Sequence, residues 1–280
     1  MTDFTSDLEG ILTIDCQPLE NIESASGLMH AKHNFKTLTY NIRSIQHNFD
    51  AFLVTLKRSK IVFDLIVLTE CWLNKNTIVP QLPTYNAYHT IKYINKSGGV
   101  VVYVRDTWNA QVNESTCEDC NCLEINIGTD FAALAIYRSP SFLNPGNFIL
   151  SLDSTLTKLR SKKNIILTGD INIDLCADPL SDHCNEYLSL LTEHQLLPAI
   201  YKPTRGNACL DHAFVKDVRN ALGLVCASGL TDHYICIVAL SLRQPQPPIF
   251  AHRGSDNGKR SLTLSINVLH CAAPRAIKFS

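Results

Sequence analysis

The stretch Asp64-Leu65-Ile66-Val67-Leu68-Thr69-Glu70 decides the fold class, because it is an almost continuous apolar run of strand length that ends in a carboxylate. A run of this kind is typical of a β-strand that is buried on both faces. The stretch Asn164-Ile165-Ile166-Leu167-Thr168-Gly169-Asp170 has the same design and also ends in a carboxylate. The sequence therefore predicts a sheet that other elements cover on both faces.

Helices and further strands alternate around these two strands. Apolar residues at helical spacing predict helices over residues 48–60, 147–159 and 182–195. Short apolar or alternating runs predict further strands over residues 35–41, 100–104, 123–127, 132–137, 208–215 and 233–240. No glycine-rich phosphate loop accompanies them, so the alternation favours an α/β sandwich over a nucleotide-binding Rossmann fold.

The patterned region has clear limits. Residues 1–35 are mixed and weakly patterned, which predicts a poorly ordered N-terminal tail. Residues 36–240 form the predicted domain. The proline-rich run at residues 244–248 starts a C-terminal tail, so that residues 241–280 are also expected to be poorly ordered.

Composition bounds the class of protein. The 280 residues are 45% hydrophobic with a formal net charge of −1, so nucleic-acid binding would rest on a local basic patch. The N-terminus lacks the features of a signal peptide, and no apolar run is long enough to span a membrane. We expect an intracellular, soluble monomer without membrane contact, whose eleven cysteines are mostly reduced.

Polar side chains gather where the predicted strands end or begin. Loops at one edge of an α/β sheet converge into a crevice, so these side chains can meet although they are far apart in the sequence. They are Asn41, Glu70, Tyr137, Asp170, Asn172, Asp211, Asp232 and His233.

Phosphodiester hydrolysis explains these residue types. The reaction needs an activated water, stabilisation of charge on the phosphoryl oxygens and help for the leaving oxygen. Mg²⁺ prefers oxygen ligands and keeps several waters, so Glu70 and Asp232 suffice as candidate ligands. Asp170 is the candidate for orienting or deprotonating the attacking water, with Asn172 as a neutral positioning donor.

Other side chains are candidates for contacts with the substrate. Tyr137 and His233 can donate to phosphate oxygens, and Asp211 can fix the tautomer of His233 from the other ring nitrogen. Arg138 and Arg205 lie near the predicted site and are candidate contacts to DNA.

Eight short blocks occur in order along the chain, over about residues 36–240. They are Leu38-Thr39-Tyr40-Asn41-Ile42-Arg43-Ser44, Ile66-Val67-Leu68-Thr69-Glu70-Cys71-Trp72-Leu73, Gly98-Gly99-Val100, Tyr137-Arg138-Ser139-Pro140, Thr168-Gly169-Asp170-Ile171-Asn172, Pro203-Thr204-Arg205, Leu210-Asp211-His212 and Thr231-Asp232-His233. Together these blocks resemble the endonuclease/exonuclease/phosphatase family and, more narrowly, the apurinic-type endonuclease domain of non-LTR (LINE-like, jockey or CR1 type) retrotransposons.

The resemblance implies a fold, a reaction and a set of roles. The fold is a four-layer α/β sandwich, with two facing mixed sheets flanked by helices. The reaction is nicking of one DNA strand with Mg²⁺ or Mn²⁺, which leaves a 3′-hydroxyl that primes reverse transcription. The implied roles are metal binding at Glu70 with Asn41 nearby and Asp232 contributing, activation of water at Asp170 and Asn172, a phosphate contact at Tyr137, and a pairing of His233 with Asp211.

The chain departs from the family pattern in three places. Thr231 stands where the family most often has Ser, so a hydroxyl is kept. Arg43 stands where repair-type members carry an acidic residue near the metal, which suits the transposon type. Residues 241–280 do not resemble the start of a polymerase, so we expect no reverse transcriptase domain in this chain.

The cluster Cys117, Cys120 and Cys122 resembles half of a zinc site. A structural zinc site normally has four ligands, and the spacing of the other cysteines and histidines is irregular. A loop of incidental cysteines before a strand is the simpler interpretation.

Two alternatives remain beside the DNA endonuclease. One is a related phosphoesterase, such as an abasic-site nuclease or a lipid or inositol phosphatase. The other is a non-catalytic remnant or partial copy of a retrotransposon that binds DNA. A nuclear location is expected only from the function, since cutting genomic DNA requires access to it.

Overall fold

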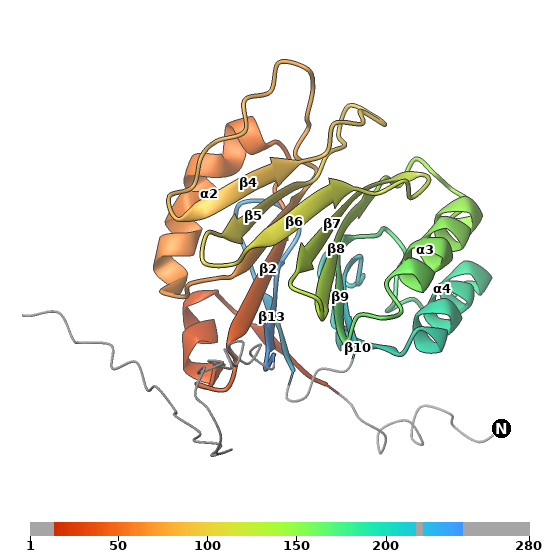
Figure 1. Cartoon of the computed structure of the whole chain (residues 1–280). Helices are drawn as coiled ribbons and strands as arrows, with labels where there is room; N and C mark the ends of the chain where they lie inside the picture. Colours follow the sequence, from red (N-terminus) through yellow and green to blue (C-terminus); the bar gives the residue numbers. More distant parts are fainter. Residues whose placement is uncertain (1–13, 217–220, 243–280) are drawn as a thin grey trace, which may run out of the picture. The chain divides into compact units, whose positions relative to one another are not determined.

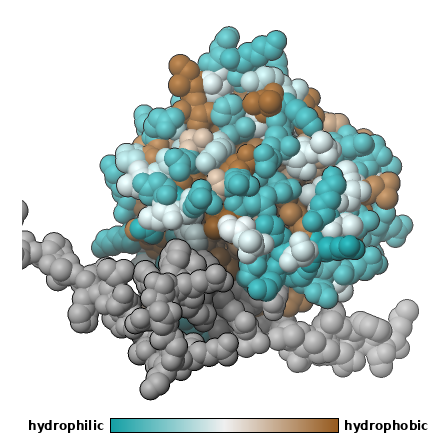
Figure 2. All heavy atoms as spheres, in the orientation of Figure 1, coloured by the Kyte–Doolittle hydropathy of each residue, from teal (hydrophilic) through white to brown (hydrophobic). Residues whose placement is uncertain are grey.

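Two mixed β-sheets face each other, and helices cover their outer faces (Figure 1). This arrangement is seen in a computed structural model that describes residues 14–216 and 221–242. It confirms the predicted α/β sandwich of two facing sheets with flanking helices. The face shown in Figure 2 is mainly hydrophilic, with hydrophobic residues scattered over it, as is usual for the solvent side of a folded domain.

The first sheet has seven strands. Its centre is the parallel pair β2 and β3, and β13 lies antiparallel to β2. In spatial order its strands are β1 (Asp15–Leu19), β12 (Leu222–Cys226), β13 (Ile235–Leu240), β2 (Phe35–Asn41), β3 (Leu65–Thr69), β5 (Val101–Arg105) and β4 (Tyr85–His89).

The second sheet has six strands. Its centre is the parallel pair β8 and β9, and β11 lies antiparallel to β9. In spatial order its strands are β10 (Leu196–Ile200), β11 (Asp211–Lys216), β9 (Asn164–Asp170), β8 (Phe131–Arg138), β7 (Cys120–Ile127) and β6 (Ala110–Glu114).

Helices provide the two outer layers. The 3-10 helix η1 (Glu23–Leu28) and α2 (Ile45–Ser59) cover the first sheet, and α3 (Gly146–Lys158) and α4 (Asp182–Glu193) cover the second. The start of α4 is capped by Ser181, whose side chain accepts a hydrogen bond of 3.1 Å from the backbone N–H of Cys184.

Both faces of the central strands are buried, which is why these strands read as continuous apolar runs. In β3, Leu65 and Val67 pack between the two sheets, whereas Ile66 and Leu68 pack under α2. Successive side chains of a strand point to opposite faces, so a strand between two packed layers needs an apolar residue at every position.

The N-terminal region corrects the expectation of a poorly ordered tail over residues 1–35. Within residues 14–35, β1 pairs in parallel with β12, and η1 packs on the first sheet. Cys16 and Ala25 are buried there. These elements are stabilised by contacts with residues distant in the chain, which a local pattern does not reveal. Residues 1–13 lie outside the described residues.

Four further strands, β4, β6, β10 and β12, were not predicted. All four are short. The strands β4 and β6 also lie at the edges of their sheets and have partly exposed residues, so the apolar pattern of these two strands is weak. Of the C-terminal tail predicted over residues 241–280, all but residues 241 and 242 lies outside the described residues. No helix within residues 14–216 and 221–242 is long and apolar enough to cross a membrane.

Strand direction places the candidate site residues at one edge of the two sheets. The parallel strands β2, β3, β8 and β9 all end there, and the antiparallel strands β11 and β13 begin there, so that Asp211 lies opposite Asp170 in the register. Two contacts join the sheets behind this edge: Thr39 Oγ1 lies 2.7 Å from Thr168 Oγ1, and Asn41 Nδ2 donates to Asp170 Oδ2 at 2.8 Å.

Candidate active site

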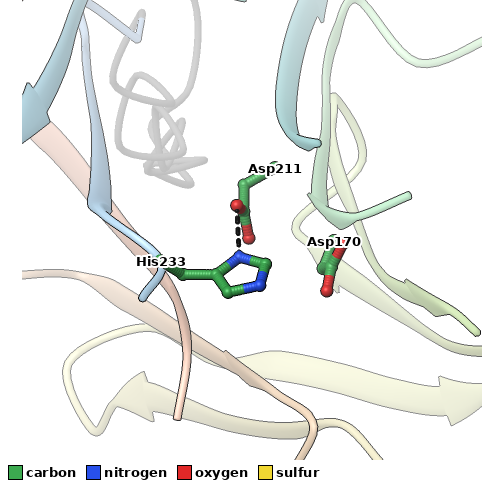
Figure 3. Close-up of side chains that lie close together, drawn as sticks. All are labelled: Asp170, Asp211 and His233. Atoms are coloured by element: carbon green, nitrogen blue, oxygen red, sulfur yellow. Dashed lines mark hydrogen bonds and ion pairs between the residues drawn. The ribbon is translucent and has the colours of Figure 1, made fainter. Parts of the chain in front are cut away.

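The centre of the site is a buried group formed by Asp170, Asp211 and His233 (Figure 3). Their exposed fractions are 0%, 1% and 1%, and one ligand atom from each lies within 4.8 Å of the others. His233 Nδ1 lies 2.8 Å from Asp211 Oδ2, so Asp211 accepts the Nδ1 proton and leaves Nε2 directed away from it. The predicted pairing of His233 with Asp211 is present in the structure.

Asn41 connects this buried group to the first sheet. Its Nδ2 donates to Asp170 Oδ2 at 2.8 Å and lies 3.4 Å from His233 Nε2. Its Oδ1 accepts a 3.2 Å hydrogen bond from the backbone N–H of Arg43. This amide therefore holds the carboxylate at the end of β9 close to the imidazole before β13.

The packing of β9 against β8 explains why the sequence Thr168-Gly169-Asp170 has a glycine at its centre. Gly169 has φ +147°, and a Cβ at this position would collide with the backbone carbonyl of Ile136 in β8. Only glycine lets β9 approach β8 this closely and deliver Asp170 to the site.

Two buried or half-buried hydroxyls hold the loops that carry the buried group. Thr204 Oγ1 accepts a 3.0 Å hydrogen bond from the backbone N–H of Asp211. Thr231 Oγ1 lies 3.1 Å from the Asn41 carbonyl and accepts a 3.2 Å bond from the His233 N–H. Thr231 thus links the end of β2 to His233. Sequence reasoning had not assigned Thr204 a role.

The electrostatics of the buried group favour a proton or a cation. Burial, and then the neighbouring charges of Asp211 and Glu70, raise the pKa of Asp170 well above its usual range, although His233 and the Asn41 amide oppose this. Burial lowers the pKa of His233, but the hydrogen bond and charge of Asp211 and the charge of Asp170 outweigh it and raise the pKa overall. A proton or a cation close to Asp170 would therefore relieve the cost of its buried negative charge, whereas the two carboxylates favour the positive form of His233 itself.

Glu70 and Tyr137 lie beside the buried group. Glu70 follows β3 with φ +47°, an uncommon conformation for a residue with a side chain, and its side chain is 15% exposed. The hydroxyl of Tyr137, at the end of β8, lies 3.5 Å from Glu70 Oε1. Burial and the charges of Glu70 and Asp170 raise the pKa of Tyr137, which keeps the phenol protonated as a donor.

Asp232 does not join the buried group. Its side chain is 42% exposed and forms a rim group with Arg43 and Arg205. Arg43 Nη1 lies 2.9 Å from Asp232 Oδ1, and Arg205 Nη2 lies 2.7 Å from Asp232 Oδ2. The predicted site residues thus divide into a buried group and an exposed rim.

Arg138 is placed differently from the prediction. Arg138 is only 2% exposed, and its guanidinium donates to the carbonyls of Ile171 and Phe142 and lies over the Phe148 ring. The expected DNA contact at Arg138 is therefore wrong, because these partners hold the side chain inside the domain. Asn172 has φ +54° and donates to the Arg138 carbonyl at 2.8 Å.

The residues present fit a divalent cation. Asp170 Oδ1 and Asp211 Oδ1 are buried and have no hydrogen-bond partner among the described residues, and Glu70 adds a third carboxylate at the same edge. A set of carboxylate oxygens suits Mg²⁺ or Mn²⁺ better than a soft metal.

The cysteine cluster does not form a comparable site. Cys117, Cys120 and Cys122 are buried at the start of β7 and pack under α3. Among the described residues, the buried group is the set of His, Cys, Asp and Glu side chains close enough to hold a metal. The structure therefore gives no support to a zinc site at these cysteines.

Comparisons with known proteins agree with this fold. Residues 38–233 match the model of the endonuclease/exonuclease/phosphatase family, so the chain belongs to that family. No curated protein matches the sequence.

Solved structures with the same fold are distant in sequence. A 3′-5′ exonuclease (NExo) from Neisseria meningitidis is 14% identical, with a TM-score of 0.59 over 74% of this chain and 100% of that chain. The catalytic domain of Xenopus laevis APE2 is 13% identical, with a TM-score of 0.54 over 74% of this chain and 92% of that chain. A family protein from Leptotrichia buccalis is 15% identical, with a TM-score of 0.56 over 74% of this chain and 100% of that chain. At these identities the likeness shows the fold.

Proposed function

We propose that this chain is a metal-dependent DNA endonuclease that nicks one strand and leaves a 3′-hydroxyl, as in target-site cleavage by a non-LTR retrotransposon. The observation that carries the proposal is the buried group, in which Asp170, Asp211 and His233 meet at the edge where the central strands of both sheets end. Family membership supports hydrolysis of a phosphoester, and the eight ordered sequence blocks support the transposon type.

The side chains have distinct roles in this reaction. Asp170, whose buried carboxylate has one unpaired oxygen, accepts a proton from the attacking water. His233, held by Asp211, donates from Nε2 to a phosphoryl oxygen, and the raised pKa favours its protonated form. Tyr137 donates a second hydrogen bond to the phosphoryl group.

A divalent cation would be held by Glu70, with Asn41 close by. When bound, Mg²⁺ or Mn²⁺ would stabilise the negative charge that develops on the phosphoryl and leaving oxygens. We propose that the enzyme acts as a monomer, and that it acts in the nucleus, because cutting genomic DNA requires access to it.

Nicking of supercoiled plasmid tests the proposal. We expect the full chain to convert supercoiled plasmid to the relaxed form with Mg²⁺ or Mn²⁺ and not with EDTA. Asp170→Ala and His233→Ala should remove the activity while the protein stays folded. Extension of the nicked product by a DNA polymerase without phosphatase treatment would establish the 3′-hydroxyl. A folded chain that does not nick in either metal would overturn the proposal.

The substrate class is tested with the same preparations. An intact duplex, an abasic duplex and a small phosphoester are compared at equal enzyme concentration. We expect the intact duplex to be cut at a rate at least comparable with that of the abasic duplex, and no turnover of the small phosphoester. A strong preference for the abasic duplex would instead identify a repair-type nuclease.

A further inference from the structure

The rim group places two guanidiniums on one carboxylate beside the buried group. Arg43 binds Asp232 with both terminal nitrogens, at 2.9 Å from Nη1 to Oδ1 and 3.1 Å from Nη2 to Oδ2. Arg205 binds Asp232 Oδ2 through Nε at 2.8 Å and Nη2 at 2.7 Å. Their side chains are 38% and 39% exposed, so solvent and a substrate can reach both.

The backbone around both arginines is tied to the active site. The backbone N–H of Arg43 donates to Asn41 Oδ1, and Arg43 itself takes the left-handed conformation with φ +44°. Arg205 follows Thr204, whose carbonyl accepts a 2.7 Å hydrogen bond from the Tyr234 N–H. The two guanidiniums therefore extend from loops that also position the Asn41 amide and His233, and they meet at the mouth of the site.

The distribution of charge in the site explains why a DNA substrate would need the two arginines. The inner site carries the carboxylates of Glu70, Asp170 and Asp211, which repel a DNA phosphate. At the rim, two guanidiniums face the Asp232 carboxylate, and Arg43 Nε also lies 3.9 Å from Glu70 Oε2, so the positive charge of the two arginines offsets part of the negative charge of the inner site. Arg205 Nη1 makes no hydrogen bond within the described residues, so it is available as a donor. Guanidiniums held in a fixed plane match phosphate oxygens in pairs.

The same contacts argue against Asp232 as a metal ligand. Both of its oxygens already accept hydrogen bonds from guanidiniums. A cation at this carboxylate would face two positive charges within the same contact distance, and their Coulomb repulsion opposes its binding.

We propose that Arg43 and Arg205 form a phosphate-binding fork for a DNA phosphate next to the one that is cut, and that Asp232 positions the two arginines instead of binding the metal. This inference rests on the proposed DNA endonuclease function. It adds Arg43 as a substrate-binding residue and assigns Asp232 a different role from the one that its place in the sequence suggests.

The fork is tested by equilibrium binding of a fluorescent DNA duplex to the full chain in EDTA, at several salt concentrations. Arg43→Gln and Arg205→Gln should each raise Kd about tenfold, since a charge-assisted hydrogen bond is lost. Each substitution should also weaken the salt dependence of binding. The negative slope of log K against log salt should become shallower by about 0.9, the value for one phosphate contact. The matched control is Arg58→Gln, which removes one exposed positive charge from the end of α2, away from the strand ends that form the site.

The role of Asp232 is tested by Asp232→Asn with two readouts. The rise in melting temperature on adding Mn²⁺ should equal that of the wild type, because the metal ligands are intact. The fall in kcat/KM for nicking should come mainly from a higher KM. Loss of the Mn²⁺-dependent rise would show that Asp232 binds the metal and would overturn its assignment.

The outcomes distinguish a failure of the phosphate-binding fork from a failure of the proposed endonuclease function. If the wild type nicks and binds DNA while Arg43→Gln and Arg205→Gln match Arg58→Gln in Kd and salt slope, the fork is wrong and the endonuclease remains. If the wild type neither nicks nor binds DNA, both are wrong.

Discussion

The buried group and the rim group contain the same kinds of charged contact but differ in their exposure to water. Asp211 and His233 are 1% exposed, whereas the side chains in the rim group are about two-fifths exposed. Charges interact strongly where water is excluded, but each buried charge then depends on its partner. Exposed ion pairs add little stability and remain open to a ligand. This difference in exposure is why we propose that the buried group carries the chemistry and that the rim group contacts the substrate.

The largest expected effect is on activity at the buried group. Asp170→Asn should lower the nicking rate by about a thousandfold, because the amide cannot accept the proton from water. In EDTA its melting temperature should not fall, since the neutral amide avoids burying a negative charge beside Asp211. The measurement is plasmid nicking beside thermal unfolding, with Asp50→Asn on the surface of α2 as the control. A nicking rate within tenfold of the wild type would contradict the role of Asp170.

The next effect concerns the close packing of strands that carries the buried group. Gly169→Ala should lower the free energy of unfolding by about 3 kcal/mol, because its Cβ would collide with the Ile136 carbonyl and overpack the core. Gly27→Ala is the control, as nothing lies within 4 Å of an added Cβ there. Chemical denaturation measures both. Equal stability of the two variants would show that β8 and β9 separate easily.

A double-mutant cycle sharpens the comparison within the buried group. Asp211→Asn, His233→Gln and the double variant should give a coupling free energy of about 1–3 kcal/mol, since removing one partner leaves the other unpaired in the interior. Denaturation curves at one pH are sufficient. Additive effects would mean that the 2.8 Å contact contributes no net stability.

The smallest effect is expected from the equivalent cycle at the rim. Arg205→Gln, Asp232→Asn and their combination should give a coupling below about 1 kcal/mol, because water screens this pair. The same denaturation protocol measures it. A coupling as large as that of Asp211 with His233 would break the distinction between the two regions.

Much of the fold could be predicted because the central strands are buried on both faces and are therefore apolar at successive positions. The apolar runs at 64–69 and 164–170 correspond to β3 and β9, and the three predicted helices correspond to α2, α3 and α4. The strand β1 could not be predicted, because it is short and is stabilised by pairing with β12, some two hundred residues away in the chain.

The site was predictable in its members and less so in their arrangement. Asp211 and His212 are neighbours in one block, yet alternation along β11 sends Asp211 to the site and His212 to the helix layer, where its Nε2 lies 2.9 Å from the Ile173 carbonyl. These two adjacent residues therefore lie in different parts of the fold. Thr204 was missed because a buried threonine that accepts backbone hydrogen bonds has no sequence signal of its own.

By itself, the sequence determined that β3 and β9 are buried on both faces and which polar residues stand at their ends, since both follow from local composition and strand period. The tertiary structure alone decided how those polar residues divide. Packing of α3 beside β8 holds Arg138 inside the domain, and two loops distant in sequence bring Arg43 and Arg205 to Asp232. Burial and ion pairing depend on neighbours that are remote in the chain, and those neighbours are set only when the two sheets close on each other.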